Sequence, residues 1–331
     1  MNNPFFIVGT GRNGSQMLSK MLGYWPEVVV LPETHFLVTL FDKYGNNKIT
    51  AIEFLAVVDD FYGSHGDKWV NVILRHANKE IENYKEGFVS FAKNKANIKE
   101  MTINFYTYLY GKNKIFGDKT PGYGSNLNIL TKIWGDIKII YLVRDGVDCA
   151  LSMLQHPAFV LNINGKVRPE DTDRIMYKGQ QLKFSKNKPK LEDSLFYWKN
   201  GVDAATKELA KIDPNNVLKV RYEDLIFNSR SELDRICKFL SLDSNNLYFK
   251  KAYLYPRAFP EISHYRKLSD KDYKNYYSRV ENTMKELDYP YNINLDISFK
   301  RVVNECLRWS ASKILNFYEN IQRIINKFRR L

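Results

Sequence analysis

The chain has 331 residues, of which 44% are hydrophobic, and its formal net charge is +13. So much apolar sequence can form a sizeable core and excludes a disordered chain, while the absence of any run of about 18 apolar residues excludes a helix that crosses a membrane. The positive charge favours an anionic partner, which leaves nucleotides, acidic glycans, nucleic acids and membrane surfaces open.

Strands and helices are predicted to alternate along the chain. Short apolar runs predict strands over residues 5–8, 28–31, 115–116, 137–143 and 217–220. Apolar residues at helical spacing predict helices over residues 17–22, 146–154 and 233–240. Near-continuous apolar strands that alternate with helices are typical of a parallel sheet with both faces covered. We therefore expect an α/β fold, with helices on both faces of a parallel sheet.

Two segments interrupt this alternation. Residues 162–190 are polar and contain eight basic residues against three acidic ones, so we expect a lid or a binding loop there. Residues 300–331 contain eight basic and two acidic residues, and their apolar positions fit one helical stripe. The sequence thus predicts one domain over residues 1–299, followed by a basic amphipathic helix. That helix either packs on the domain edge or contacts an anionic membrane surface.

The cysteines and the N-terminus bear on the cellular compartment. Cys149, Cys237 and Cys306 lie far apart and show no metal-ligand spacing. We therefore expect no disulfide framework, no metal site, and a reducing compartment such as the cytoplasm. The chain enters its first strand without a basic start, a long apolar run or a cleavage site, so we expect no signal peptide.

The first motif that carries chemistry lies between the first strand and the first helix, where residues 9–16 read GTGRNGSQ. Glycines there allow the backbone to approach a phosphate, and the helix N-terminus offers free N–H groups. Arg12 adds a guanidinium that can grip phosphate oxygens, and Ser15 adds a hydroxyl. A Walker A loop is excluded because no Gly-Lys-Ser/Thr ends the turn. The segment predicts a phosphate-binding loop.

The same glycines permit a second interpretation. Gly9, Gly11 and Gly14 match the G-x-G-x-x-G pattern of dinucleotide-binding proteins, and Glu33 follows the second strand, where a ribose-binding acid would be sought. An NAD(P)-dependent oxidoreductase is therefore the alternative function. A basic protein that binds nucleic acid or a membrane is a third class, tested by salt-dependent binding without turnover.

A second motif separates the first two interpretations. Arg144 stands at the end of the predicted fourth strand, and Ser152 follows on the next helix. An arginine fork and a hydroxyl can converge on one phosphate, and a dinucleotide enzyme needs no such second site. A salt bridge from Arg144 to Asp145 or Asp148 is the alternative explanation for the arginine alone.

Together, the two motifs resemble the family of sulfotransferases that use 3′-phosphoadenosine 5′-phosphosulfate (PAPS), and the resemblance covers roughly residues 4 to 290. It implies a P-loop nucleotide-hydrolase-like fold and in-line sulfuryl transfer without a metal. It also assigns the 3′-phosphate to Arg144 and Ser152. The 5′-phosphosulfate is assigned to the loop residues Gly11, Arg12, Asn13, Gly14, Ser15 and Gln16. Of these, Asn13, Ser15 and Gln16 depart from the family's usual Ser-Gly-Thr-Thr, although Ser15 keeps a hydroxyl.

Other segments are similar to further parts of the family pattern. Residues 32–35, PETH, correspond to the segment of the catalytic base, which implies Glu33 with His35 as the alternative. Residues 117–121, GDKTP, imply that Lys119 lies beside the transferring group. Residues 221–225, RYEDL, imply that Tyr222 contacts the nucleotide. Residues 264–267 resemble loosely a loop that closes over the cofactor, which adds Tyr265 and Arg266. Trp198 also fits a helix position common in the family, but we expect it in the core.

The predicted function is transfer of a sulfuryl group from PAPS to an acceptor hydroxyl. A carbohydrate acceptor is our first choice because the basic segment of residues 162–190 suits an anionic polymer; lipids, tyrosyl peptides and small alcohols stay open. We expect no nucleic-acid partner and a cytoplasmic protein, in which residues 300–331 either pack on the domain edge or make a peripheral membrane contact.

Overall fold

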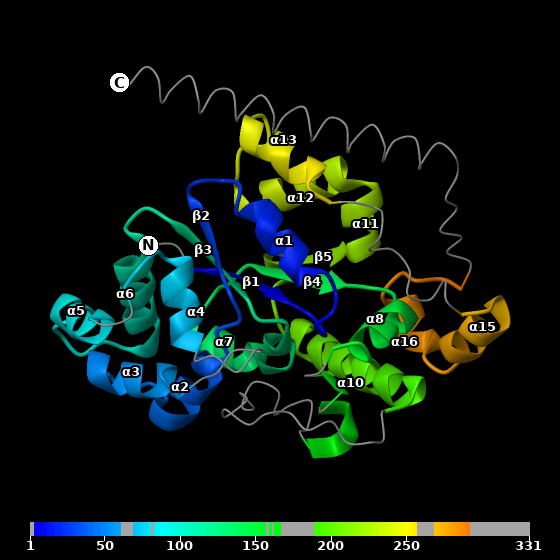
Figure 1. Ribbon diagram of the computed structural model, residues 1–331, viewed down its shortest axis with the longest axis horizontal. Helices are drawn as coiled ribbons and strands as arrows, with labels where there is room; N and C mark the ends of the chain where they lie inside the picture. The colour runs from blue at the N-terminus through cyan, green and yellow to red at the C-terminus, as the bar shows by residue number, and fades with distance from the viewer. Residues whose placement is uncertain are drawn as a thin grey trace.

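The computed structural model describes residues 3–60, 69–80, 83–156, 159–160, 162–166, 189–256 and 268–291 (Figure 1). Within these residues, five strands form one sheet in the order β2-β3-β1-β4-β5, and every neighbouring pair is parallel. The strands are β1 (Phe5–Val8), β2 (Val28–Leu31), β3 (Ile115–Lys119), β4 (Ile139–Val143) and β5 (Val217–Arg221). The predicted parallel α/β sheet is confirmed, with β3 extending further toward the C-terminus than its apolar residues indicated.

Helices cover both faces of the sheet, as predicted. Phe5 and Ile7 of β1 face one apolar cluster, and Phe6 and Val8 face the other, because successive side chains of a strand point to opposite faces. Figure 1 shows α1 (Ser15–Leu22), α12 (Ser229–Leu240) and α13 (Leu247–Leu254) on one side of the sheet. The other side carries α7 (Leu127–Trp134), α8 (Gly146–Met153) and α10 (Leu191–Leu209).

A helical insertion lies between β2 and β3. It contains α2 (Phe36–Tyr44), α3 (Ala51–Val58), α4 (Trp69–His76), α5 (Tyr84–Phe91) and α6 (Ile98–Tyr110). The rings of Phe54, Phe88 and Phe105 contact one another at its centre, with centroid distances between 5.0 and 5.9 Å. None of these helices was predicted from the sequence.

The remaining described elements connect the strands or follow the last one. They are η1 (Pro121–Asn126), η2 (Asn162–Lys166), η4 (Pro214–Asn216), α11 (Tyr222–Phe227), α15 (Asp270–Ser278) and α16 (Glu281–Glu286). Trp198 of α10 is buried and packs against Gly146, so it belongs to the core. No helix among the described residues is both long and apolar enough to cross a membrane.

Three predictions fall wholly or mostly outside the described residues. They are the lid at residues 162–190, of which residues 167–188 are not described, the loop with Tyr265 and Arg266, and the helix over residues 300–331. All three stay predictions, as does the division of the chain at residue 299.

Candidate active site

The loop between β1 and α1 has the backbone conformation that its glycines allow. Gly11 and Gly14 have φ angles of 72° and 90°, in the left-handed region that favours glycine. A Cβ atom on Gly14 would lie 2.2 Å from the ring of Tyr222, and one on Gly11 would lie 2.5 Å from the ring of Phe159. Both positions therefore require glycine, and the loop is fixed between two aromatic rings.

Asn13 holds this loop to the neighbouring strand. Its Nδ2 donates a hydrogen bond of 2.8 Å to the backbone oxygen of Leu142 in β4, and its Oδ1 accepts one of 3.3 Å from the backbone N–H of Ser15. The side chain is fully buried. Asn13 thus shapes the loop from within, whereas Gln16 of the same predicted set is exposed to solvent.

Residues from the two phosphate motifs meet beside the loop. Arg12 Nε donates to the hydroxyl of Ser152 over 3.2 Å, and Arg144 Nη1 donates to the backbone oxygen of Arg12 over 2.8 Å. The guanidinium carbon of Arg144 lies 4.5 Å from the ring centroid of Tyr222. The structure therefore brings together four predicted nucleotide-binding residues that come from three separate segments of the sequence.

The two arginines differ in their charge partners. Arg144 Nε donates to Asp148 Oδ2 over 2.7 Å, Nη2 of the same guanidinium makes an ion pair with that oxygen, and both side chains are buried. Burial alone would lower the pKa of Arg144, but the charge of Asp148 raises it above its ordinary value. Arg12 is exposed and makes no ion pair within the described part of the chain. The Arg144 charge is therefore balanced by a carboxylate before any ligand binds, whereas the Arg12 charge is not.

The predicted catalytic residues lie at the ends of β2 and β3. Lys119 Nζ donates to Glu33 Oε1 over 2.8 Å, and Nε2 of His35 lies 3.2 Å from Glu33 Oε2. The Lys119 side chain is 8% exposed and that of Glu33 is 41% exposed, so the ammonium group is nearly buried and the Glu33 side chain is partly buried. Burial acts to raise the pKa of Glu33, but Lys119 and His35 outweigh it and hold the pKa well below its usual range.

Two buried carboxylates lie at the strand end that carries Arg144: Asp145, which the sequence offered as an ion-pair partner of Arg144, and Glu223, which it did not single out. Glu223 Oε1 accepts a 3.1 Å hydrogen bond from the backbone N–H of Asp145, and Tyr289 donates to Glu223 Oε2 over 2.5 Å. Tyr273 donates to Asp145 Oδ2 over 2.8 Å. Burial raises the pKa of Glu223 to about 7 and that of Asp145 to about 6. These bonds attach residues 268–291 to the strand end that carries Arg144.

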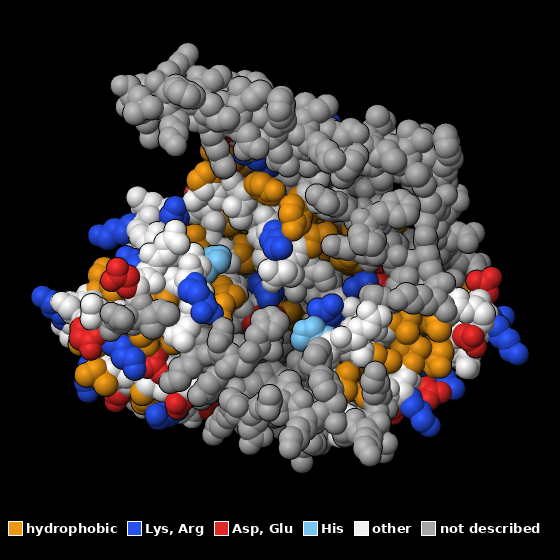
Figure 2. Space-filling model, in the orientation of Figure 1, with side chains coloured by type: hydrophobic (Ala, Val, Ile, Leu, Met, Phe, Trp, Pro, Cys, Tyr) orange, Lys and Arg blue, Asp and Glu red, His pale blue; other side chains and the backbone are white. Residues whose placement is uncertain are grey.

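Basic side chains surround this region on the molecular surface. Figure 2 shows lysine and arginine side chains, with histidine among them, near the middle of the face where α1 and β1 lie in Figure 1. In the described part of the chain, no cluster of three or more His, Cys, Asp or Glu side chains is placed to hold a metal ion.

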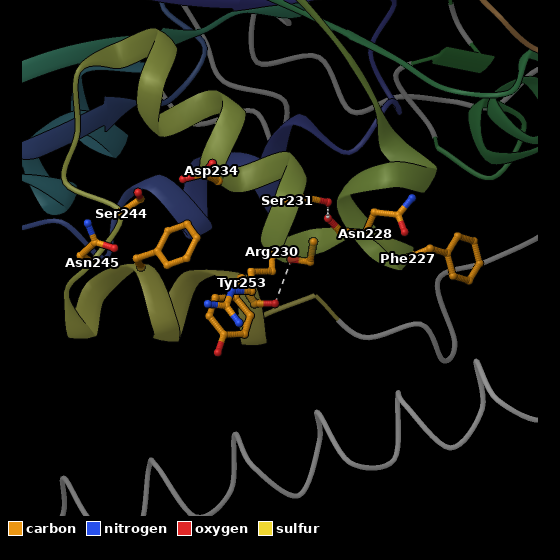
Figure 3. A pocket seen from close by; sticks show the side chains of 10 residues that line it. Phe227, Asn228, Arg230, Ser231, Asp234, Ser244, Asn245 and Tyr253 are labelled. Atoms are coloured by element: carbon orange, nitrogen blue, oxygen red, sulfur yellow. Dashed lines mark hydrogen bonds between the residues drawn. The ribbon is translucent and has the colours of Figure 1, made fainter.

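A separate cavity of about 550 Å³ lies between α11, α12 and α13 (Figure 3). Its lining includes Ser229, Ser231 and Tyr253 but none of the predicted site residues. Ser229 Oγ donates to the backbone oxygen of Tyr253 over 2.8 Å, and Ser231 Oγ donates to that of Asn228 over 2.9 Å. These hydroxyls are used within the protein, so we do not place the reaction there.

The chain is similar to proteins of a known family. The model of the Sulfotransferase family matches residues 4–246. No curated protein sequence matches the chain.

Solved structures of sulfotransferases resemble the fold. The sulfotransferase domain from the curacin biosynthetic pathway is 17% identical, with a TM-score of 0.50 over 76% of this chain and 78% of that one. The sulfotransferase domain of the Synechococcus PCC 7002 olefin synthase is 18% identical, with a TM-score of 0.49 over 94% and 96%. The sulfotransferase from Alicyclobacillus acidocaldarius is 14% identical, with a TM-score of 0.47 over 87% and 96%. The family match gives the oxidoreductase alternative no support. From the extent of the family match, this chain belongs to the sulfotransferase family.

Proposed function

We propose that this protein transfers a sulfuryl group from PAPS to the hydroxyl of an acceptor. The observation that carries the proposal is the meeting of Arg12, Arg144 and Ser152 beside the N-terminus of α1. Two guanidinium groups, a hydroxyl and free backbone N–H groups are what a ligand with two separate phosphate groups requires. The 3′-phosphate and 5′-phosphosulfate of PAPS supply those two groups.

Each residue of this cluster has a proposed contact. Arg144 and Ser152 would bind the 3′-phosphate, and Arg12 with the backbone of residues 11–15 would bind the 5′-phosphosulfate. Tyr222, packed against Gly14 and Arg144, would contact the nucleotide. Tyr265 and Arg266 would close over the donor, although they lie outside the described residues.

Proton removal is assigned to Glu33, with His35 as the second candidate. An acceptor hydroxyl attacks the sulfur well only if a base takes its proton as the new S–O bond forms. In the donor-free protein, Glu33 is a weak base because Lys119 stabilises its ionised form. When Lys119 turns toward the bridging oxygen of the donor, Glu33 Oε1 becomes free and its pKa rises toward the ordinary value.

Lys119 would then act at the other end of the reaction. The S–O bond to the 5′-phosphate breaks as the acceptor S–O bond forms, and negative charge develops on the bridging oxygen. The Lys119 ammonium offsets this charge, and the proton that leaves the acceptor hydroxyl moves to Glu33. Such a transfer depends mainly on positioning and charge stabilisation, as phosphoryl transfer does.

The acceptor and the location are also proposals. A carbohydrate acceptor is supported by the eight basic and three acidic residues of the segment 162–190. The three scattered cysteines support a cytoplasmic protein, and the basic segment 300–331 supports a peripheral membrane contact.

Transfer of isotopically labelled sulfate from PAPS tests the proposal. The full chain is incubated with labelled PAPS and a panel of carbohydrates, lipids, tyrosyl peptides and small alcohols, and products are read by mass spectrometry. We expect a labelled sulfate ester that Arg12→Ala abolishes and that Arg230→Ala, a control on the exposed side of α12, leaves unchanged. A chain that labels no acceptor and binds no PAPS product, but binds NAD tightly, would overturn the proposal.

A further inference from the structure

A buried polar network joins the ends of β2 and β3 directly beneath the proposed catalytic residues. Asp118 Oδ2 accepts a 2.6 Å hydrogen bond from the hydroxyl of Thr34, and Oδ1 accepts one of 2.7 Å from that of Thr120. The Thr120 hydroxyl in turn accepts the backbone N–H of Thr34 over 2.8 Å. All three residues are at most 1% exposed.

Tyr123 extends the network to the start of α2. Its hydroxyl lies 2.9 Å from that of Thr34 and accepts a 3.2 Å hydrogen bond from the backbone N–H of Leu37. The network therefore fixes the backbone N–H groups of Thr34 and Leu37, where the chain leaves β2 and enters α2.

The network alternates in sequence with the catalytic residues. Thr34 lies between Glu33 and His35, and Lys119 lies between Asp118 and Thr120. Asp118 is the register partner of Leu31, the last residue of β2, so the two segments run side by side as they leave the sheet. Because adjacent side chains of a strand point to opposite faces, Lys119 lies on the opposite face of β3 from the inward-facing Asp118. On the other segment, the backbone leaves the extended conformation at His35, which has a φ angle of 49°.

We infer that Thr34 and Asp118 are positioning residues, whose buried hydrogen bonds hold Glu33, His35 and Lys119 in contact across the ends of two strands. The inference rests on the proposed function, because it assigns these contacts a part in sulfuryl transfer. Neither Thr34 nor Asp118 touches the reacting atoms in this account.

Packing alone does not explain this choice of residues. Valine has nearly the shape of threonine, and an apolar group would fill the same space without the cost of burying a hydroxyl and a carboxylate. Burial raises the pKa of Asp118 to about 6, and the hydrogen bonds from Thr34 and Thr120 only partly oppose this effect. Unlike apolar packing, hydrogen bonds have a preferred direction, so the network fixes the orientation of the two segments beside the reacting groups.

The test replaces the hydroxyl of Thr34 and nothing else. Thr34→Val removes the donor to Asp118 at nearly constant volume, and Thr34→Ser restores it. Thr102→Val is the matched control, because Thr102 is also fully buried and its hydroxyl donates to the backbone oxygen of Ile98 over 2.7 Å, within α6. For each full-length variant, turnover of PAPS, affinity for 3′-phosphoadenosine 5′-phosphate (PAP) and the rate of Lys119 acetylation by acetic anhydride are measured below the unfolding transition.

We expect Thr34→Val to lower turnover by about 10- to 100-fold, as a misplacement of reacting groups by roughly 1 Å would, with PAP affinity unchanged. Lys119 should be acetylated faster, since its ion pair with Glu33 loosens. Thr34→Ser and Thr102→Val should behave as the wild type in all three measurements.

Wild-type turnover and wild-type acetylation in Thr34→Val would overturn the inference. An equal loss of turnover in Thr34→Ser would also overturn it, because the size of the side chain and not its hydroxyl would then matter. So would an equal loss of turnover in Thr102→Val, because the effect would then follow from the loss of any buried threonine hydroxyl. Failure of the wild type to use PAPS would refute the proposed function instead, and the acetylation rates would still decide whether Thr34 positions Lys119.

Discussion

Replacing Arg144 should damage folding as well as nucleotide binding. The side chains of Arg144 and Asp148 are 7% and 4% exposed, so Arg144→Ala leaves a buried carboxylate without its guanidinium. Breaking a buried ion pair in this way costs about 3–5 kcal/mol, and the loss of the cation–π contact with Tyr222 adds roughly 0.5–1 kcal/mol. Arg12→Ala should change the free energy of unfolding by less than about 1 kcal/mol, because Arg12 is exposed.

The double variant Arg144→Ala/Asp148→Asn separates the two effects. Because it removes both charges, we expect it to recover most of the lost stability, measured by urea unfolding. Its 3′-phosphate site remains without the arginine. Calorimetry with PAP and with AMP, which lacks the 3′-phosphate, should show that the preference for PAP falls by roughly 2–5 kcal/mol.

Two results would refute this reasoning. If Arg144→Ala unfolds with the wild-type free energy, the buried pair with Asp148 does not contribute as described. If the double variant keeps the wild-type ratio of PAP to AMP affinity, Arg144 does not bind the 3′-phosphate.

Three further predictions follow from the site and its surroundings. Glu33→Gln should lower turnover by roughly 10²- to 10⁴-fold with nucleotide affinity nearly intact, and His35→Asn should do less; a dead histidine variant beside a normal glutamine variant would move the base to His35. The pKa of Glu223 is about 7 in the folded protein against an ordinary 4.5, so the folded state keeps a proton that the unfolded state has released. Stability measured by urea unfolding should therefore fall as pH rises through this window, by on the order of 2 kcal/mol, and Glu223→Gln should flatten the slope; a flat wild-type profile would contradict the assignment. Liposome flotation of the full chain and of a truncation after Phe299 should be equal and negligible if residues 300–331 pack on the domain, whereas flotation of the full chain alone would indicate a membrane contact.

The sheet and the phosphate loop could be predicted because their signals are local. Strands buried on both faces appear as apolar runs, and Val28–Leu31 has the same bounds in the sequence and in the structure. The glycines of the loop and Arg144 at a strand end mark the edge of a parallel sheet where ligands bind. The meeting of Arg12 with Ser152 follows from that topology.

The buried polar groups could not be predicted in the same way. Three of them, Thr34, Asp118 and Glu223, are sequence neighbours of predicted site residues. Whether each side chain faces the core or the site depends on where its strand ends. Nor does the sequence show that Asn13 would be used to tie the loop to β4. Such roles depend on contacts between residues far apart in the chain, for which a single sequence carries no periodic signal.

The helical insertion was missed for a related reason. The rings of Phe54, Phe88 and Phe105 contact one another across three different helices, α3, α5 and α6. Such contacts between helices leave no pattern in the sequence of any one of them. The capping box at the start of α3, in which Thr50 and Glu53 bond reciprocally, is the local signal that could have located this helix.

Calorimetric titration of the wild-type chain with PAP, AMP and NAD is the decisive test of the two-phosphate site. We expect PAP to bind far more tightly than AMP, and NAD not to bind. Saturation with PAP at 100 times its Kd should raise the free energy of unfolding by roughly 2.7 kcal/mol. No binding of PAP, equal affinity for PAP and AMP, or tighter binding of NAD would contradict a site built by Arg12, Arg144 and Ser152 for the two phosphate groups of PAPS.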